Sequence, residues 1–196
     1  MSDERKSIIK DEVFTIPNIL VYIRIALIPV FVYLYIGAKS NADYCTALAV
    51  MTIAFLTDFF DGKIARYFNC VTSLGKIMDP IADKLYQFMV AVCLAVKVPK
   101  MTVIVCLLFV KEISMGIMGL MLINRGGEIF SAKWYGKFCT AFVDLTMVFF
   151  LITPLRGIDV PSAVMNVLII LCSVILVFTA VMYTKLFAKK IKDTDK

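Results

Sequence analysis

Long apolar stretches separated by short polar connections run through this chain. Six of them reach the roughly 20 mostly apolar residues that a membrane-spanning helix needs. They lie at residues 16–37, 44–64, 76–96, 101–123, 133–153 and 161–183. The pattern predicts an all-α fold, an integral membrane bundle of six transmembrane helices.

Composition supports a single membrane-embedded unit, because 61% of the 196 residues are hydrophobic, against about 45–50% in soluble domains. The formal net charge is +6. Basic residues gather before the first stretch, between the second and third, between the fourth and fifth, and after the sixth. By the positive-inside rule both termini are expected in the cytoplasm. We therefore expect a cytoplasmic juxtamembrane segment at 1–15, a six-helix domain at 16–184 and a basic cytoplasmic tail at 185–196.

Acidic residues inside the second and third stretches conflict with this apolar background. Each carboxylate at membrane depth costs at least ~2.5 to 3.5 kcal/mol, so a group of them needs compensation. Asp58 and Asp61 lie at i and i+3 of one predicted helix, and Asp79 and Asp83 at i and i+4 of the next. If the two helices pack antiparallel, the four carboxylates converge on one pocket. Pro80 leaves two alternatives open: the third helix begins near Asp79, or it is kinked there.

The residue types favour a hard metal ion in this pocket. Histidine is absent, and the six cysteines are scattered as expected of packing residues. Four carboxylates stay ionised together only with cations present, and oxygen-only ligation points to Mg²⁺ or Mn²⁺, with two ions expected. Such ions are common partners of a diphosphate. Small residues at Gly62, Ala65 and Gly75 would allow a nucleotide diphosphate close to the backbone.

The whole stretch resembles the signature of the CDP-alcohol phosphatidyltransferases, D-x2-D-G-x2-A-R-x8-G-x3-D-x3-D, which residues 58–83 match throughout. The resemblance implies that Asp58, Asp61 and Asp79 are metal ligands. It implies that Asp83 also borders the metals and is the general base toward the acceptor hydroxyl. Arg66 would hold the diphosphate or base of the donor, beside Gly62, Ala65 and Gly75.

The start of the first stretch is similar to the P-N-x-L-T-x-x-R opening of bacterial phosphatidylglycerophosphate synthases and related cardiolipin synthases. Pro17, Asn18, Leu20 and Arg24 match this opening, and Val21 stands where threonine is usual. Through this resemblance Asn18 is assigned to the CDP-donor site.

Three lysines are candidates for binding a phosphate on the acceptor: Lys111, Lys133 and Lys137. Lys111 precedes Glu112 within the fourth stretch, similar to an Arg–Glu pair of those synthases. In the alternative reading Lys111 pairs with Asp144, and the other two lysines are ordinary positive-inside residues.

The expected activity is transfer of a phosphatidyl group from CDP-diacylglycerol to glycerol 3-phosphate, which gives phosphatidylglycerophosphate and CMP. A cardiolipin synthase, with phosphatidylglycerol as acceptor, is the nearest alternative. A divalent-cation transporter is a remote one, since acidic residues within spans also mark ion pathways. Membrane lipid is a further expected partner, and no nucleic acid is expected. The resemblance to the family also implies a second copy of the chain as partner, in a homodimer.

Overall fold

A computed structural model of the chain describes residues 15–67, 73–126, 133–157 and 160–194. Within these ranges the side chains of residues 16–17, 58–67, 73–77, 79, 156 and 193–194 lie outside the description.

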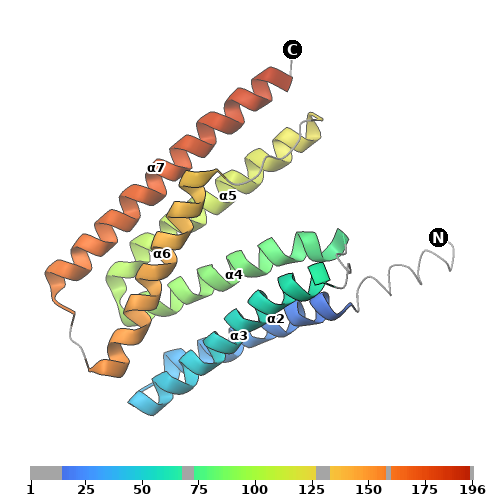
Figure 1. The fold of residues 1–196 in the computed structure, drawn as a ribbon. Coiled ribbons are helices and arrows are strands. Elements are labelled where there is room, and N and C mark those ends of the chain that lie inside the picture. The colour runs from blue at the N-terminus through green and yellow to red at the C-terminus, as the bar shows by residue number, and fades with distance from the viewer. Residues whose placement is uncertain (1–14, 68–72, 127–132, 158–159, 195–196) are drawn as a thin grey trace. The chain divides into compact units, whose positions relative to one another are not determined.

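The described residues form helices and no strand, which confirms the all-α prediction. Two short 3-10 turns, Pro99–Met101 and Thr153–Arg156, accompany long α-helices (Figure 1). The long helices are α2 (Ile16–Gly37), α3 (Asn41–Tyr67), α4 (Ser73–Lys97), α5 (Thr102–Asn124), α6 (Trp134–Ile152) and α7 (Ser162–Thr194).

Four helical segments among the described residues are long and apolar enough to cross a membrane, so the chain is a membrane protein. They are Asn18–Gly37, Pro99–Asn124, Trp134–Leu155 and Ser162–Lys192. The aspartate-bearing helices α3 and α4 are not among these four. Six spans with both termini in the cytoplasm therefore stay a prediction.

The chain divides by its internal contacts into two compact units, Met1–Cys93 and Leu94–Lys196. The boundary falls within α4, and each unit is described by itself. In the first unit, α2 and α3 pack side by side as an antiparallel hairpin (Figure 1). In the second unit, α7 packs against both α5 and α6. The expected boundaries at residues 15 and 184 stay predictions, although α7 continues as one helix beyond Tyr183.

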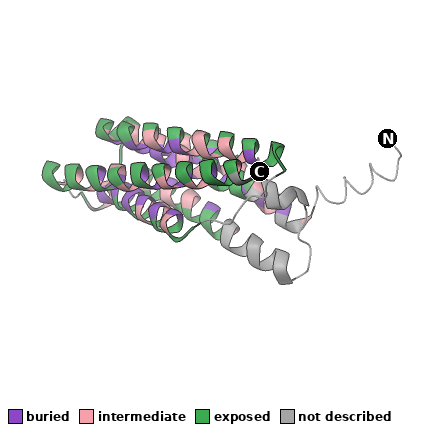
Figure 2. Cartoon of the chain, turned by 90° about the horizontal axis from the view of Figure 1, so that it is seen from above, coloured by how far each residue is buried: buried purple, intermediate pink, exposed green. Residues whose placement is uncertain are grey.

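One side of α2 is buried in the first unit, and the opposite side exposes apolar residues such as Ile19 and Ile23. Figure 2 shows the same division on single helices, with buried residues on one side of a helix and exposed residues on the other. Exposed apolar side chains on a helix suit contact with lipid. The buried side of α2 carries Asn18, Val21, Arg24, Ile28, Phe31 and Tyr35.

Helix α3 begins with a capping box formed by Ser40 and Asp43. The backbone N–H groups of Lys39 and Ser40 donate to Asp43 Oδ2 at 3.0 and 2.9 Å, and the Asp43 N–H donates to Ser40 Oγ at 3.3 Å. These bonds satisfy backbone donors that have no partner within the helix. The hydrogen bonds from Lys39 and Ser40 lower the pKa of the Asp43 carboxyl below its ordinary value.

Helix α4 begins at Ser73, so Pro80 lies inside it. This excludes the alternative that the helix starts near Asp79. Two turns further along, the Tyr86 hydroxyl donates to the backbone carbonyl of Met51 at 3.3 Å, which links α4 to α3.

In the second unit, α6 and α7 approach closely where Tyr183 covers Gly136. A Cβ placed on Gly136 would lie 2.9 Å from Tyr183 Cε2 and 3.0 Å from Cζ, and it would also overlap the hydroxyl. The Tyr183 hydroxyl accepts a hydrogen bond from the backbone N–H of Lys133 at 3.1 Å. Tyr183 also packs in a buried cluster with Leu122 and Phe187, which ties α5 and α7 together.

Candidate active site

The helix segments that carry the aspartate motif lie at one end of the first unit. The last turns of α3, the first turns of α4 and the start of α2 are found together at this end (Figure 1). The antiparallel course of consecutive helices places them there. Of the residues predicted for this pocket, seven have side chains outside the described residues: Asp58, Asp61, Gly62, Ala65, Arg66, Gly75 and Asp79. Their convergence on one pocket stays a prediction.

Asp83, the last aspartate of the motif, is described and makes an ion pair across helices. Arg24 Nη1 of α2 donates to Asp83 Oδ1 of α4 at 2.6 Å. The Arg24 side chain is only 2% exposed, whereas the Asp83 side chain is 53% exposed. The guanidinium is therefore enclosed by the helices, and the carboxylate extends toward accessible space.

Asn18, predicted to bind the CDP donor, lies in the first turn of α2 and is buried. It is on the buried side of α2 that also carries Arg24. Burying two polar side chains within two turns of an otherwise apolar helix is costly unless they have hydrogen-bond or charge partners. Their place near the start of α2 puts them at the same end of the unit as the motif.

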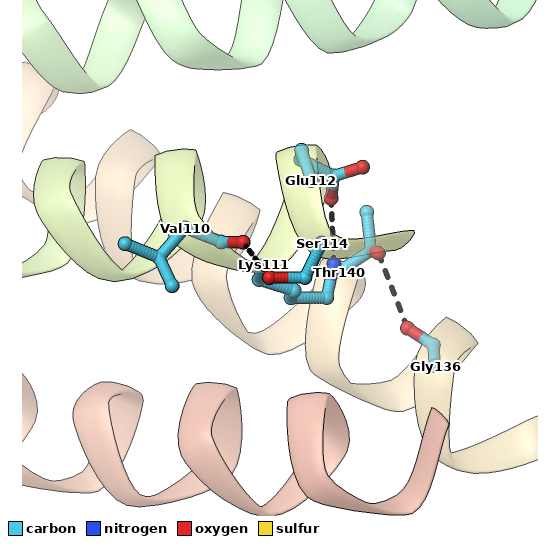
Figure 3. A network of polar contacts seen from close by, with 6 residues as sticks. All are labelled: Val110, Lys111, Glu112, Ser114, Gly136 and Thr140. Atoms are coloured by element: carbon cyan, nitrogen blue, oxygen red, sulfur yellow. Dashed lines mark hydrogen bonds and ion pairs between the residues drawn. The ribbon is translucent and has the colours of Figure 1, made fainter. Parts of the chain in front are cut away.

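Lys111 is buried in the middle of α5. Its Nζ contacts Glu112 Oε1 at 2.6 Å, and the Glu112 side chain is 29% exposed. Figure 3 shows this ion pair beside the turn of α6 in which Thr140 Oγ1 donates to the Gly136 carbonyl at 3.1 Å. The structure thus gives Lys111 a partner on its own helix, and pairing with Asp144 of α6 stays a hypothesis.

Lys133 and Lys137 are exposed at the start of α6. Lys133 precedes the first helical residue, and the backbone bond from its N–H to Tyr183 fixes this end of α6 against α7. Both lysines belong to the second unit, as does Lys111. Their approach to the aspartate motif of the first unit stays a prediction.

The sequence pattern did not identify Arg24 as the partner of Asp83. The signal was present, because an arginine within a membrane span always carries charge and needs a counter-ion in the fold. A linear pattern cannot say which of four aspartates fills that role. The close approach of Tyr183 to Gly136 was also missed, since a lone glycine at the start of a helix has several explanations.

The metal ions stay a prediction, and the chemistry of the expected donor set agrees with it. Carboxylates alone, carried by adjoining helix ends, fit Mg²⁺ or Mn²⁺. Among the side chains that the structure describes, no group of three or more possible ligands occurs. Three of the four motif aspartates are not among those side chains.

Comparison with known proteins identifies the class of protein. The family model for CDP-alcohol phosphatidyltransferase matches residues 14–186. The chain therefore belongs to the CDP-alcohol phosphatidyltransferase family, and it is an enzyme of that class.

The chain is similar to several bacterial proteins of this family. It is 31% identical over 171 residues to the CDP-diacylglycerol–glycerol-3-phosphate 3-phosphatidyltransferase of Aquifex aeolicus, covering 86% of this chain and 93% of that protein. It is 32% identical over 161 residues to the probable phosphatidylglycerophosphate synthase of Mycobacterium tuberculosis H37Rv, covering 81% and 76%. A putative cardiolipin synthase of the same organism is 40% identical over 83 residues, which span 42% of this chain and only 38% of that relative.

Proposed function

We propose that this enzyme transfers the phosphatidyl group of CDP-diacylglycerol to glycerol 3-phosphate, giving phosphatidylglycerophosphate and CMP. The observation that carries the proposal is the extent of the similarity. Two relatives named for this reaction or its product align with 81% and 86% of the chain. The putative cardiolipin synthase aligns with 42% of it.

The buried lysine of α5 supports an acceptor with a phosphate. A lysine that is only 4% exposed carries its charge in an apolar helix at a considerable cost in free energy. The carboxylate that the structure pairs with it, Glu112, is partly exposed. A site that lowers the cost of this charge by binding a phosphate explains why the sequence has lysine here. Lys133 and Lys137, which are exposed at the start of α6, would bind the same phosphate.

The motif residues would handle the donor and the transferred group. Asn18, Gly62, Ala65, Arg66 and Gly75 would hold the CDP portion. Asp58, Asp61, Asp79 and Asp83 would hold Mg²⁺ or Mn²⁺, and such ions would neutralise the charge that develops on the phosphate of the departing CMP. Asp83 would accept the proton of the acceptor hydroxyl as that oxygen attacks the phosphorus bearing the diacylglycerol group, with CMP as the leaving group.

We place the active site at the cytoplasmic face of a six-span, multi-pass protein. The uneven distribution of basic residues supports this orientation. The resemblance to the family supports a homodimer. The four aspartates at positions 58, 61, 79 and 83 are accounted for by the family's motif, so ion transport has no separate observation in its favour.

The acceptor is tested by supplying purified protein with CDP-diacylglycerol, Mg²⁺ and one acceptor at a time. Glycerol 3-phosphate should support CMP release, while free glycerol, which lacks the phosphate, should be a poor substitute. The lipid product should carry a terminal phosphate monoester.

A cardiolipin synthase is the second candidate, because the mycobacterial relative of that name is 40% identical over 83 residues. In the same assay phosphatidylglycerol would then support CMP release, and glycerol 3-phosphate would not. That outcome would overturn the proposed acceptor while leaving the enzyme class intact.

A further inference from the structure

The ion pair between Arg24 and Asp83 is unequal in its surroundings. Arg24 cannot lose its charge, and with 2% of its side chain exposed it depends on a carboxylate within the fold. Asp83 has 53% of its side chain exposed, so the carboxylate is much less enclosed than the guanidinium. The ion pair therefore offsets the cost of burying the charge of Arg24. For Asp83, its main effect is to fix the orientation of the carboxylate.

The Arg24 side chain is itself held in place by its surroundings. It lies on the buried side of α2, between Val21 and Ile28, which are 1% and 4% exposed. Packing on that side restricts the long side chain, and the 2.6 Å contact restricts the carboxylate in turn. A charge-assisted bond of this length is among the stronger ones in proteins.

The next turn of α4 is held from another direction. Tyr86 follows Asp83 by three residues and donates its hydroxyl to the Met51 carbonyl of α3. The α4 segment that carries Asp83 is thus joined to α2 through Arg24 and to α3 through Tyr86. Only the first of these links touches the carboxylate.

We propose that Arg24 is a positioning residue for the transfer reaction: from α2 it holds the Asp83 carboxylate in the orientation that the reaction requires. The proposal rests on the function proposed above, in which Asp83 acts on the acceptor hydroxyl. Small displacements of a reacting group, on the order of 1 Å, can cost ~10²-fold in rate. Arg24 would act through Asp83 and need not touch substrate.

Replacing Arg24 with methionine is the first test, because it removes the buried charge and leaves an apolar side chain among apolar neighbours. Rates are measured per folded protein, with folding followed by thermal unfolding in detergent. Arg24→Met should lower kcat by ~10²-fold, with the KM for CDP-diacylglycerol changed by less than about threefold. Arg24→Lys should recover part of the lost kcat, since an ammonium can still contact the carboxylate.

A double variant tests whether Arg24 acts through Asp83. Arg24→Met combined with Asp83→Asn should be no slower than Asp83→Asn alone, because the residue being oriented has already lost its function. Tyr86→Phe is the matched control. It removes the link between α4 and α3 without touching Asp83, and its kcat should stay near that of the wild type.

Several outcomes would overturn the proposal. A kcat for Arg24→Met within about threefold of the wild type would do so, as would losses that multiply in the double variant. Equal losses of kcat in Arg24→Met and Tyr86→Phe would show that helix packing is the cause. If Arg24→Met fails to fold, Arg24→Gln takes its place, and failure of both makes the arginine a structural residue. A wild-type protein that releases no CMP with any acceptor would instead reject the proposed function, and the role of Arg24 with it.

Discussion

Asp83 is both the proposed base and the counter-ion of a buried arginine. Loss of activity in Asp83→Asn therefore has two possible physical causes, a missing proton acceptor and an arginine left without its charge partner. The second cause also lowers the free energy of unfolding, because a buried charge that loses its partner is strongly destabilising. Measuring stability beside activity separates the two.

The other motif aspartates give a simpler prediction. Asp58→Asn and Asp79→Asn keep the side-chain shape but remove charge, and the activity with Mg²⁺ should fall by ~10-fold or more. The concentration of Mg²⁺ or Mn²⁺ needed for half-maximal activity should rise. If either variant keeps nearly wild-type activity at low Mg²⁺, that aspartate is not a metal ligand.

Lys111→Gln should weaken binding of the acceptor, glycerol 3-phosphate, more than binding of the donor, CDP-diacylglycerol. Losing a charge-assisted contact of ~1.5 to 3 kcal/mol predicts a 10- to 150-fold rise in the KM for glycerol 3-phosphate. Steady-state kinetics with each substrate varied in turn would measure this. Lys100→Gln is the control, since Lys100 is exposed and donates to Asn166 instead. A Lys111→Gln protein that unfolds and is rescued by Asp144→Asn would mean that Lys111 is a structural partner of Asp144.

Helices were more predictable from the sequence than the contacts between them. The apolar run at 16–37 coincides with α2, because its flanks are polar and its interior uniformly apolar. The end of α7 was less evident, since the lysines and alanine that follow Tyr183 are good helix formers and continue the helix to Thr194. The sequence could not decide whether Pro80 stands at the start of α4 or inside it, because the one hydrogen bond that a proline removes does not by itself end a helix. The pairing of Arg24 with Asp83 depends on how α2 and α4 face each other, which hydrophobic periodicity leaves open.

The packing of α6 on α7 predicts that Gly136→Ala is destabilising. The added methyl would overlap the Tyr183 ring, and such overpacking costs about 1–3 kcal/mol. Thermal unfolding in detergent would measure the loss. Gly116→Ala in α5 is the matched control, because nothing lies within 4 Å of its added Cβ. Equal stability of the two variants would show that α6 and α7 can separate at little cost.

The capping box at the start of α3 predicts a pH dependence. The pKa of Asp43 is lowered in the folded protein from its ordinary value of 3.8, so its contribution to stability is present above that value. The contribution is lost as the pH falls through the folded-state pKa. The difference in unfolding midpoint between the wild type and Asp43→Ala should therefore be constant near neutral pH and shrink below about pH 4. A difference that persists unchanged in acid would mean that the charge of Asp43 is not what stabilises the helix start.

Two membrane topologies are compared for the whole molecule: the six spans predicted from the sequence, and the four candidate spans found among the described residues. The two arrangements differ at the end of α3. With six spans a reporter fused after Tyr67 lies in the cytoplasm, whereas with only four spans it lies on the opposite side. Fluorescent-protein and alkaline-phosphatase fusions at this site, and after Lys39 as a control on the outer side, would decide it. Phosphatase activity after Tyr67 would reject the six-span topology.

Helix α7 has 33 residues in one continuous run, a length of about 50 Å at 1.5 Å per residue. The hydrocarbon core of a bilayer is only about 30 Å thick, so the helix is longer than the core. The bond between the Tyr183 hydroxyl and the Lys133 backbone fastens the start of α6 to this helix at a fixed distance along it. Because of this bond, the position of α7 in the membrane would determine how deep Lys133 and Lys137 lie relative to the lipid head groups. Inserting or deleting a single turn of α7 before Tyr183 would shift both lysines by about 5 Å along the axis of α7, without altering any residue of the catalytic motif.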